Sequence, residues 1–286
     1  MVAALASSAA LWRRPAFASA PAGGIVAVDW AAAESLLALG VAPRAVADVS
    51  VYREWLPEIA LPPEVLDLGS RADPNFELVA SLRPDRILIS NWQANLKEQF
   101  ERIAPTETIA IIAPPSSPLR NAAQALLQVA RPLGRSGEAE RYLAAFEDAL
   151  GGLAARRSSG RAVIVAILHE NGRQLYAYGE GSWVHDVLVR LGIRNALKAR
   201  TSRFGNALIN LAQLADYSEA RLLYLDQGER TRRAEEALSR STLWGRLPIV
   251  IRDDVRSIPA FYALGGLPSA WRCARLIANA LNNESR

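Results

Sequence analysis

Short apolar runs alternate with segments of helical periodicity through the first 118 residues. Each run is bounded by glycine, proline or charged residues, which is typical of buried strands in a parallel sheet. We expect strands at residues 24–30, 45–51, 64–68, 84–90 and 108–112, and helices at 31–39, 75–82 and 96–103. This alternation predicts an α/β lobe with a mainly parallel sheet.

From residue 119 to about 157 the pattern is helical throughout. Apolar residues recur at spacings of three and four, as at Tyr142, Leu143, Phe146, Leu150 and Leu153. This spacing places them on one face of a helix. We therefore predict a single long helix over about residues 136–157, which would connect two lobes stiffly and allow small rocking motions.

A second α/β pattern follows this helical region. We expect strands at residues 161–168, 174–178, 220–225, 249–252 and 255–258, and helices at 182–191, 233–239 and 269–282. The predicted organisation is an N-terminal lobe (21–118), a helical connector (119–158) and a C-terminal lobe (159–286), with a cleft between the lobes.

Residues 1–20 have the features of an export signal. A run of small apolar residues is followed by Ala18-Ser19-Ala20, an A-x-A pattern typical of secretory cleavage sites. The expected basic segment does not precede the run, because Arg13 and Arg14 follow it. We therefore expect an upstream start codon, cleavage near Ala20 and a periplasmic protein. The Sec and twin-arginine routes both stay open, and a frayed alanine-rich helix is the alternative.

Composition excludes several classes of function. The formal net charge of the 286 residues is only +4, so nucleic acid is not an expected partner. The single cysteine, Cys273, cannot form an internal disulfide or a cysteine zinc site. With only His169 and His185 as histidines, a metal site would depend on carboxylates. We predict a monomer without a protein-bound metal or cofactor.

Enzyme signatures are weak. The sequence contains no phosphate-binding loop, dinucleotide fingerprint or nucleophile elbow. His185 and Asp186 stand within a predicted helix with no nucleophile near them. His169 beside Glu170 is the better carboxylate–histidine pair, although a turn at a strand end explains it equally well.

Aromatic residues and one arginine follow the predicted strands of the first lobe. Ligands of open α/β sheets bind outside the carboxyl ends of the strands. The residues at these ends are Trp30, Tyr52, Trp55, Arg71 and Trp92. Aromatic rings and a planar guanidinium suit a bulky ligand with an apolar exterior and clustered oxygens. Core packing is the alternative for each aromatic residue.

Several segments resemble the class III periplasmic binding proteins, and more closely the ferric hydroxamate (ferrichrome-type) siderophore-binding proteins. Residues 25–30 and 46–48 match the opening of the superfamily, and residues 67–78 are the most specific segment. Further matches cover residues 52–55, 102–105, 241–244 and 258–260. The resemblance spans nearly the whole mature chain and implies two α/β lobes, one long connecting helix and a shallow siderophore cleft.

The resemblance also implies roles for particular residues. Arg71 matches the arginine that contacts the hydroxamates, and Trp30 and Trp55 match cleft tryptophans. Gln93 stands where the family has a tyrosine and Phe204 where it has a tryptophan, so the particular siderophore stays open. The complete predicted ligand set is Trp30, Tyr52, Trp55, Arg71, Trp92, Gln93, Phe204 and Tyr262.

Members of this family dock on an inner-membrane ABC permease through one acidic residue in each lobe. Glu98 matches the acid of the first lobe. The position of the second falls on Ala212, where this sequence departs from the family. Asp216 or Glu219 could replace it, and we predict Asp216.

The resemblance thus predicts a periplasmic component of an ABC importer that captures ferric hydroxamate siderophores without catalysis. Iron would arrive as the ferric siderophore complex. Another chelate on the same fold is the first alternative: a catecholate, a corrinoid, or haem with Tyr262 or His169 as axial ligand. A catecholate would favour more basic residues than Arg71 and Arg53. A two-lobed α/β enzyme is the alternative of a different class.

Overall fold

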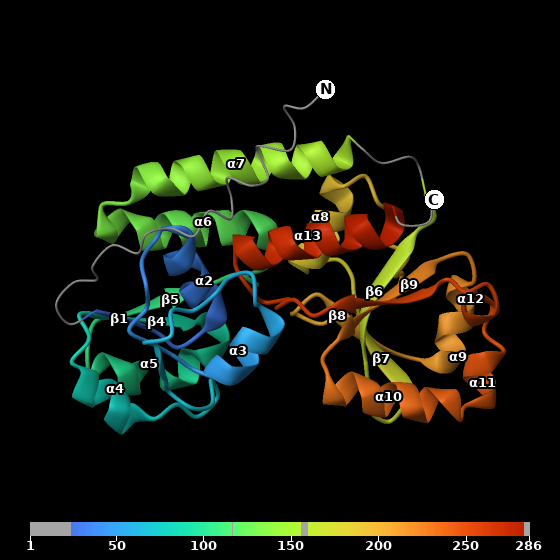
Figure 1. Cartoon of the computed structure of the whole chain (residues 1–286), viewed down its shortest axis with the longest axis horizontal. Helices are drawn as coiled ribbons and strands as arrows, with labels where there is room; N and C mark the ends of the chain where they lie inside the picture. The colour runs from blue at the N-terminus through green and yellow to red at the C-terminus, as the bar shows by residue number, and fades with distance from the viewer. Residues whose placement is uncertain (1–23, 116, 156–159, 283–286) are drawn as a thin grey trace. The chain divides into compact units, whose positions relative to one another are not determined.

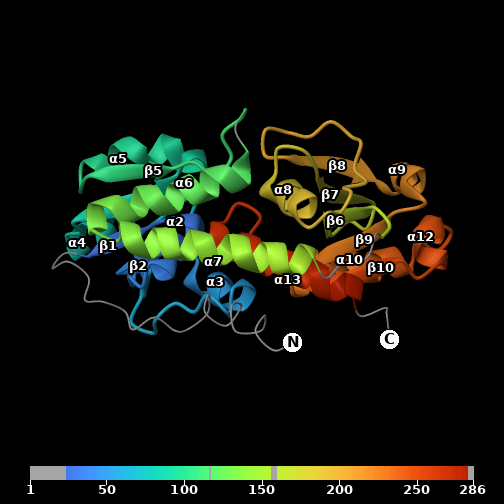
Figure 2. The same cartoon turned by 90° about the horizontal axis from the view of Figure 1, so that it is seen from above.

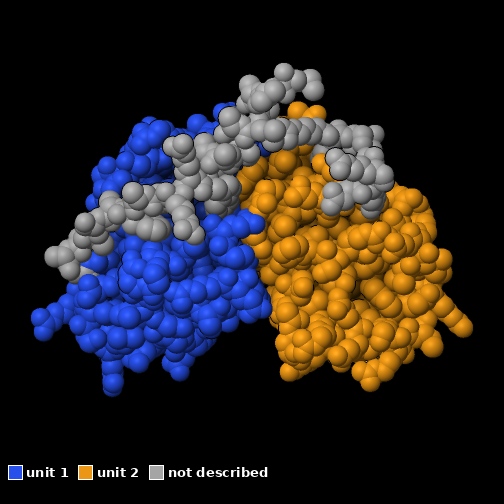
Figure 3. Space-filling view, in the orientation of Figure 1, with its two compact units in different colours: residues 1–149, 264–269 blue, residues 150–263, 270–286 orange. Residues whose placement is uncertain are grey.

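The computed structural model describes residues 24–115, 117–155 and 160–282 (Figure 1). The predicted export signal, residues 1–20, lies outside this part of the chain. The chain divides into two compact units, which Figure 3 colours separately. Unit 1 comprises residues 1–149 and 264–269, and unit 2 comprises residues 150–263 and 270–286. The domain limits predicted at residues 118 and 158 stay a prediction.

Unit 1 contains a five-stranded sheet in the order β3-β2-β1-β4-β5, with every neighbouring pair parallel. The mainly parallel sheet predicted for the first lobe is therefore confirmed. Its strands are β1 (Ile25–Ala27), β2 (Ala45–Val46), β3 (Leu66–Asp67), β4 (Arg86–Ser90) and β5 (Thr106–Ile109). The helices are α2 (Trp30–Ala38), α3 (Val49–Trp55), α4 (Phe76–Leu82), η2 (Asn91–Leu96), α5 (Lys97–Glu101), α6 (Pro118–Ala130) and η3 (Arg131–Leu133).

The strand predicted at residues 45–51 is wrong beyond Val46, because α3 begins at Val49. Asp48 adopts a left-handed conformation with φ of 53°. Its backbone N–H donates to the carbonyl oxygen of Gly69 at 2.7 Å, which ends the strand and turns the chain. The β-branched residues that suggested a strand therefore start a helix instead.

Unit 2 contains a second five-stranded sheet in the order β10-β9-β6-β7-β8. β6, β9 and β10 are parallel, whereas β7 is antiparallel to both neighbours. The strands are β6 (Val163–Leu168), β7 (Gln174–Tyr178), β8 (Asn206–Asn210), β9 (Arg221–Asp226) and β10 (Val255–Pro259). The helices are α8 (Trp183–Arg190), α9 (Leu211–Leu214), η4 (Ala215–Tyr217), α10 (Glu229–Ser239), α11 (Thr242–Gly245), α12 (Pro248–Ile251) and α13 (Leu267–Asn282).

Several segments of unit 2 differ from the sequence prediction, which did not include the short helices α9, η4 and α11. The expected strand at residues 249–252 is the short helix α12, which starts with Pro248 at a position where a missing N–H costs nothing. Strand β8 was not predicted, because its apolar and polar residues do not alternate as they do in a half-buried strand. Ala207 and Ile209 are buried, but the apolar Leu208 between them is 48% exposed.

The predicted long helix is confirmed as α7 (Ser136–Ala154). It lies beside α6 in both views of the chain (Figure 1, Figure 2). The boundary between the units falls within α7, after Ala149. Among the described residues, no helix combines the length and the hydrophobicity needed to cross a membrane.

A buried carboxyl group in unit 1 holds the start of α13. Glu34, on α2, accepts hydrogen bonds from the backbone N–H groups of Gly266 at 2.8 Å and Ser269 at 3.3 Å. It also accepts a hydrogen bond from the Ser269 hydroxyl. Glu34 thereby satisfies N–H groups that the first turn of a helix leaves unpaired. Burial raises its pKa to about 8, and these hydrogen bonds only partly oppose the rise.

Glu34 should make stability depend on pH. Between its ordinary pKa of 4.5 and about 8, the folded carboxyl keeps a proton that the unfolded chain has lost. The free energy of unfolding should therefore fall as pH rises through this window, by up to about 1.4 kcal/mol per pH unit. In Glu34→Gln that slope should disappear in urea unfolding measured across the same range. The exposed Glu64→Gln is the control and should keep the slope of the wild type; an equal slope in Glu34→Gln would contradict this assignment.

Candidate ligand-binding site

An ion pair and an aromatic ring fix the guanidinium of Arg71. Its Nε donates to Oδ2 of Asp48 at 2.7 Å, and the Arg71 backbone N–H reaches the same oxygen at 3.3 Å. The Arg71 Cζ lies 3.6 Å from the centre of the Trp30 ring, in a cation–π contact. The side chain is 18% exposed. A fixed cation therefore reaches the surface of unit 1.

The turn after β3 places Arg71 beside Asp48. Asp67 ends this strand and accepts hydrogen bonds from the backbone N–H groups of Gly69 at 2.9 Å and Val49 at 3.2 Å. Gly69 has a φ of +78°, which favours glycine. One carboxylate thus joins two neighbouring strand ends, because β2 and β3 are adjacent in the sheet.

Three predicted aromatic residues form a cluster beneath Arg71. The Trp30 ring meets Tyr52 edge-on with centroids 5.4 Å apart, and meets Trp55 in the same way at 5.9 Å. The Trp30 indole N–H donates to the carbonyl oxygen of Ala47 at 2.9 Å. Edge-to-face packing of this kind fixes ring orientation. Trp30 and Tyr52 are fully buried, whereas Trp55 is partly exposed.

Gln93 connects the end of β4 to the Arg71 turn. Its side-chain amide donates to the carbonyl oxygen of Arg71 at 2.7 Å and accepts from the Ser90 backbone N–H at 2.9 Å. The neighbouring Trp92 donates from its indole N–H to Oδ2 of Asp29 at 3.1 Å. Asp29 also caps α2 by accepting from the backbone N–H of Ala31 at 2.9 Å. Four strand ends are thereby joined in one polar network.

The structure brings together all six ligand residues predicted in the first lobe, but three of them are fully buried and three are partly exposed. Trp30, Tyr52 and Gln93 are fully buried, and burial raises the pKa of the Tyr52 hydroxyl well above its ordinary value. These three can support a ligand site from below. Direct contact is open to the partly exposed side chains, which are Trp55, Arg71 and Trp92.

The two predicted residues of unit 2 have different environments. Phe204 is partly exposed, and the guanidinium of Arg203 lies 4.7 Å from the centre of its ring. Its turn is fixed at Gly205, where a Cβ would come within 2.2 Å of the Ser182 backbone nitrogen. Tyr262 is only 7% exposed, so little of its ring can reach a ligand in this conformation.

Sequence reasoning missed the two aspartates that organise the network. Asp48 orients Arg71, and Asp29 orients Trp92. Both directly follow apolar runs at the carboxyl ends of strands, and Asp29 is completely buried. The sequence signal that could have identified them is an acidic residue directly after an apolar run, because a buried carboxylate needs hydrogen-bond donors close by.

The residues considered for catalysis or metal binding are engaged in turns and ion pairs. Nδ1 of His169 accepts the backbone N–H of Asn171 at 3.2 Å, and Glu170 forms ion pairs with Arg230 and Arg233. Among the described residues, no group of three histidine, cysteine, aspartate or glutamate side chains is placed to hold a metal ion.

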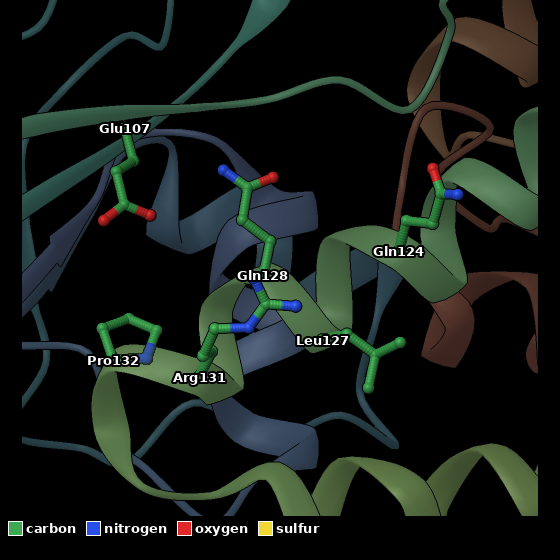
Figure 4. A pocket seen from close by; sticks show the side chains of 6 residues that line it. All are labelled: Glu107, Gln124, Leu127, Gln128, Arg131 and Pro132. Atoms are coloured by element: carbon green, nitrogen blue, oxygen red, sulfur yellow. The ribbon is translucent and has the colours of Figure 1, made fainter.

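A separate surface hollow of about 650 Å³ lies in unit 1 (Figure 4). It is lined by residues of β5, α6 and η3, and none of them belongs to the predicted ligand set. The lining residues are Glu107, Gln124, Leu127, Gln128, Arg131 and Pro132.

Comparison with known proteins finds similar chains among siderophore-binding proteins. The iron(3+)-hydroxamate-binding protein of Escherichia coli K12 is 30% identical over 263 residues, covering 91% of this chain and 88% of that protein. A siderophore-binding protein of Vibrio cholerae, solved with Fe³⁺–Desferal, superposes with a TM-score of 0.84 at 26% identity. That match covers 90% of this chain and 97% of the other.

The fold is shared more widely. The triscatecholate siderophore-binding protein of Bacillus subtilis superposes with a TM-score of 0.76 at 18% identity, covering 93% of this chain and 94% of that chain. The class III fold predicted from the sequence is therefore confirmed. A family model described as "Periplasmic binding protein" matches residues 25–262. That family comprises non-catalytic substrate-binding proteins, and this chain belongs to it.

Proposed function

We propose that this chain captures ferric hydroxamate siderophores at the Arg71 network and delivers them to an inner-membrane ABC permease. The observation that carries the proposal is the fixed, partly exposed guanidinium of Arg71 on the Trp30 ring. The names of the Escherichia coli and Vibrio cholerae proteins support the ligand class, since those proteins bind a ferric hydroxamate and Fe³⁺–Desferal.

Arg71 would recognise the oxygens around the iron. A guanidinium presents five N–H donors in a planar fork, and the carbonyl oxygens of iron-bound hydroxamates are acceptors on the surface of the complex. A hydrogen bond from a charged donor contributes about 1.5–3 kcal/mol. Asp48 holds the fork in one orientation, so less side-chain entropy is lost when the ligand binds.

The aromatic residues would cover the apolar parts of the ligand. Trp55 and Trp92 are the partly exposed aromatic side chains of the network, and buried Trp30, Tyr52 and Gln93 would hold them and Arg71 in place. From unit 2 we propose Phe204, with Tyr262 as a lesser contributor because it is buried. The siderophore itself supplies the ligands of the iron, so the protein needs to supply none.

The first test is a titration of the protein from Pro21 onward, followed by tryptophan fluorescence. Ferric hydroxamates should quench the fluorescence saturably at micromolar or lower concentration, because Trp55 and Trp92 lie at the proposed site. Haem, a corrinoid and a ferric catecholate run in parallel should give no saturable response. A response to one of these chelates and to no hydroxamate would refute the proposed ligand class.

Arg71→Ala should weaken ferric hydroxamate binding by about 10- to 100-fold, because one charged donor is lost. Isothermal titration calorimetry would measure the change. Arg131→Ala is the control, since Arg131 is exposed on η3 and does not belong to the predicted ligand set. It should bind as the wild type does. Unchanged affinity in Arg71→Ala would remove Arg71 from the site.

For delivery, we propose a periplasmic location after export and cleavage near Ala20, and docking through Glu98 of unit 1. Glu98 lies on α5 with its side chain 82% exposed, and Arg102 donates to it at 2.6 Å. It also borders a surface hollow of about 460 Å³, lined in addition by Phe76, Asn95, Gln99 and Ile103. An arginine of the permease could enter this hollow and compete with Arg102. Asp216, exposed on η4, is the candidate in unit 2.

Glu98→Gln should weaken docking on the permease about tenfold without changing siderophore affinity, because a charge pair across the interface is lost. Surface plasmon resonance on immobilised permease nanodiscs would measure this. Glu101→Gln on the same helix, where Glu101 pairs with Lys97 at 3.4 Å, is the control and should dock normally. Equal docking by Glu98→Gln and the wild type would exclude Glu98.

A further inference from the structure

Glu34 is a buried acid that lies one helical turn from the candidate ligand site. It is on α2, and Trp30, whose ring lies under the Arg71 guanidinium, is the first residue of the same helix. The Glu34 carboxyl accepts hydrogen bonds from Gly266 and Ser269, in the segment that returns to unit 1. A single helix of unit 1 therefore connects a ligand-site residue to a buried acid.

The titratable groups that face the Glu34 carboxyl are all acids or phenols. They are Asp29 at the start of the same helix, Tyr52 of α3 and Tyr142 of α7. Burial raises the pKa of both phenols, and the nearby charge of Glu34 adds to that rise. In the part of the chain that the structure describes, no base forms an ion pair with Glu34. These surroundings favour the neutral form of the carboxyl.

Two hydroxyl groups near Glu34 hold unused hydrogen-bond donors. The hydroxyls of Tyr52 and Tyr142 are buried, and neither has a hydrogen-bond partner among the described residues. A buried polar group without a partner is costly, and so is a buried charge. An ionised carboxylate is a pure acceptor with room for about four donors. Loss of the Glu34 proton would therefore draw these two hydroxyls toward the new charge.

Tyr52 is also part of the aromatic cluster beneath Arg71. Its ring meets that of Trp30 edge-on, with centroids 5.4 Å apart, and the Arg71 Cζ lies 3.6 Å from the Trp30 ring centre. Protein interiors are close-packed, so a shift of one buried ring displaces the rings that contact it. A movement of Tyr52 toward Glu34 would thus remove support from Trp30 and, through it, from Arg71.

We infer that Glu34 is a positioning residue of the ligand site. Its neutral carboxyl leaves Tyr52 packed against Trp30, which keeps Arg71 oriented for the siderophore. The carboxylate form draws Tyr52 away and weakens siderophore binding. This inference rests on the proposed capture of ferric hydroxamates, and it makes that capture sensitive to pH.

Binding and protonation are then linked. The protonated protein binds the siderophore more tightly, so the complex keeps the Glu34 proton to higher pH than the free protein does. In the free protein the pKa of Glu34 is about 8. Affinity should therefore be highest below this pH and fall as pH rises above it. Near pH 8, each binding event should take up a fraction of a proton.

The test measures ferrichrome binding by isothermal titration calorimetry at several pH values. Ferrichrome is a suitable probe because its ferric complex has no titratable group near pH 8. From about pH 6.5 to about pH 9.5 the wild-type affinity should fall roughly five- to tenfold, as expected if binding raises the proton affinity of Glu34 about tenfold. Titrations in buffers of different ionisation enthalpy should show the proton uptake. Circular dichroism at each pH checks that the protein is folded.

Two variants connect the pH profile to Glu34. Glu34→Gln keeps an oxygen that accepts from Gly266 but has no proton to lose, so its affinity should not vary across this range and its binding should take up no proton. Ser269→Ala removes a hydrogen bond that lowers the pKa of Glu34, so the fall in affinity should begin at higher pH. The exposed Glu64→Gln is the control and should keep the wild-type profile.

The outcomes separate this inference from the proposed function. Ferrichrome binding that is independent of pH in the wild type, or an unchanged pH profile in Glu34→Gln, would overturn the inference and leave the proposed function intact. If Glu34→Gln does not fold, Ser269→Ala decides, and a profile that stays in place or moves to lower pH overturns the inference. If the wild type binds no ferric hydroxamate at any pH, the proposed function fails and the inference fails with it.

Discussion

The ion pair between Asp48 and Arg71 is the contact on which the candidate ligand site depends. It joins the end of β2 to the turn after β3, and it holds the guanidinium over the Trp30 ring. Both side chains are mostly buried, so removal of either partner would leave a poorly solvated charge. The left-handed turn at Asp48 has a structural consequence too, because it ends β2 and starts the helix that carries Tyr52 and Trp55.

Buried carboxyl groups serve unit 1 in two different ways. Asp29 accepts an indole N–H and a backbone N–H at the edge of the sheet, where it orients Trp92 and starts α2. Glu34, one turn further along the same helix, faces the first turn of α13 instead. Among the residues that the structure describes, no ion pair compensates the burial of Glu34, and burial raises its pKa to about 8. Polar groups within the core thus position both the candidate site and the segment 264–269 that returns to unit 1.

A protein that captures a ligand and also docks on a transporter needs two kinds of surface. Ligand contacts favour aromatic rings and a single oriented cation, as around Arg71. Docking favours exposed charge that acts over distance and costs little to desolvate. In this chain the charge is divided by unit: described acids outnumber described bases in unit 1, which carries Glu98, and described bases outnumber described acids in unit 2. The lobes are similar in architecture, yet their surfaces are electrically opposite.

The sequence by itself determined the α/β alternation, the long helix and the family resemblance, because apolar periodicity and motif residues are local properties. It was wrong at residues 49–51 and 249–251, where residues of strand type lie in helices begun by a left-handed turn or by Pro248. Only the tertiary structure decided which predicted residues are buried. The hydrogen bonds that decide it join residues far apart in the chain, such as Trp92 and Asp29, separated by 63 positions. The buried residues, which can only support the site, are Trp30, Tyr52 and Gln93; the partly exposed ones, which can contact a ligand, are Trp55, Arg71 and Trp92. This difference depends on packing between strand ends, which no local sequence pattern encodes.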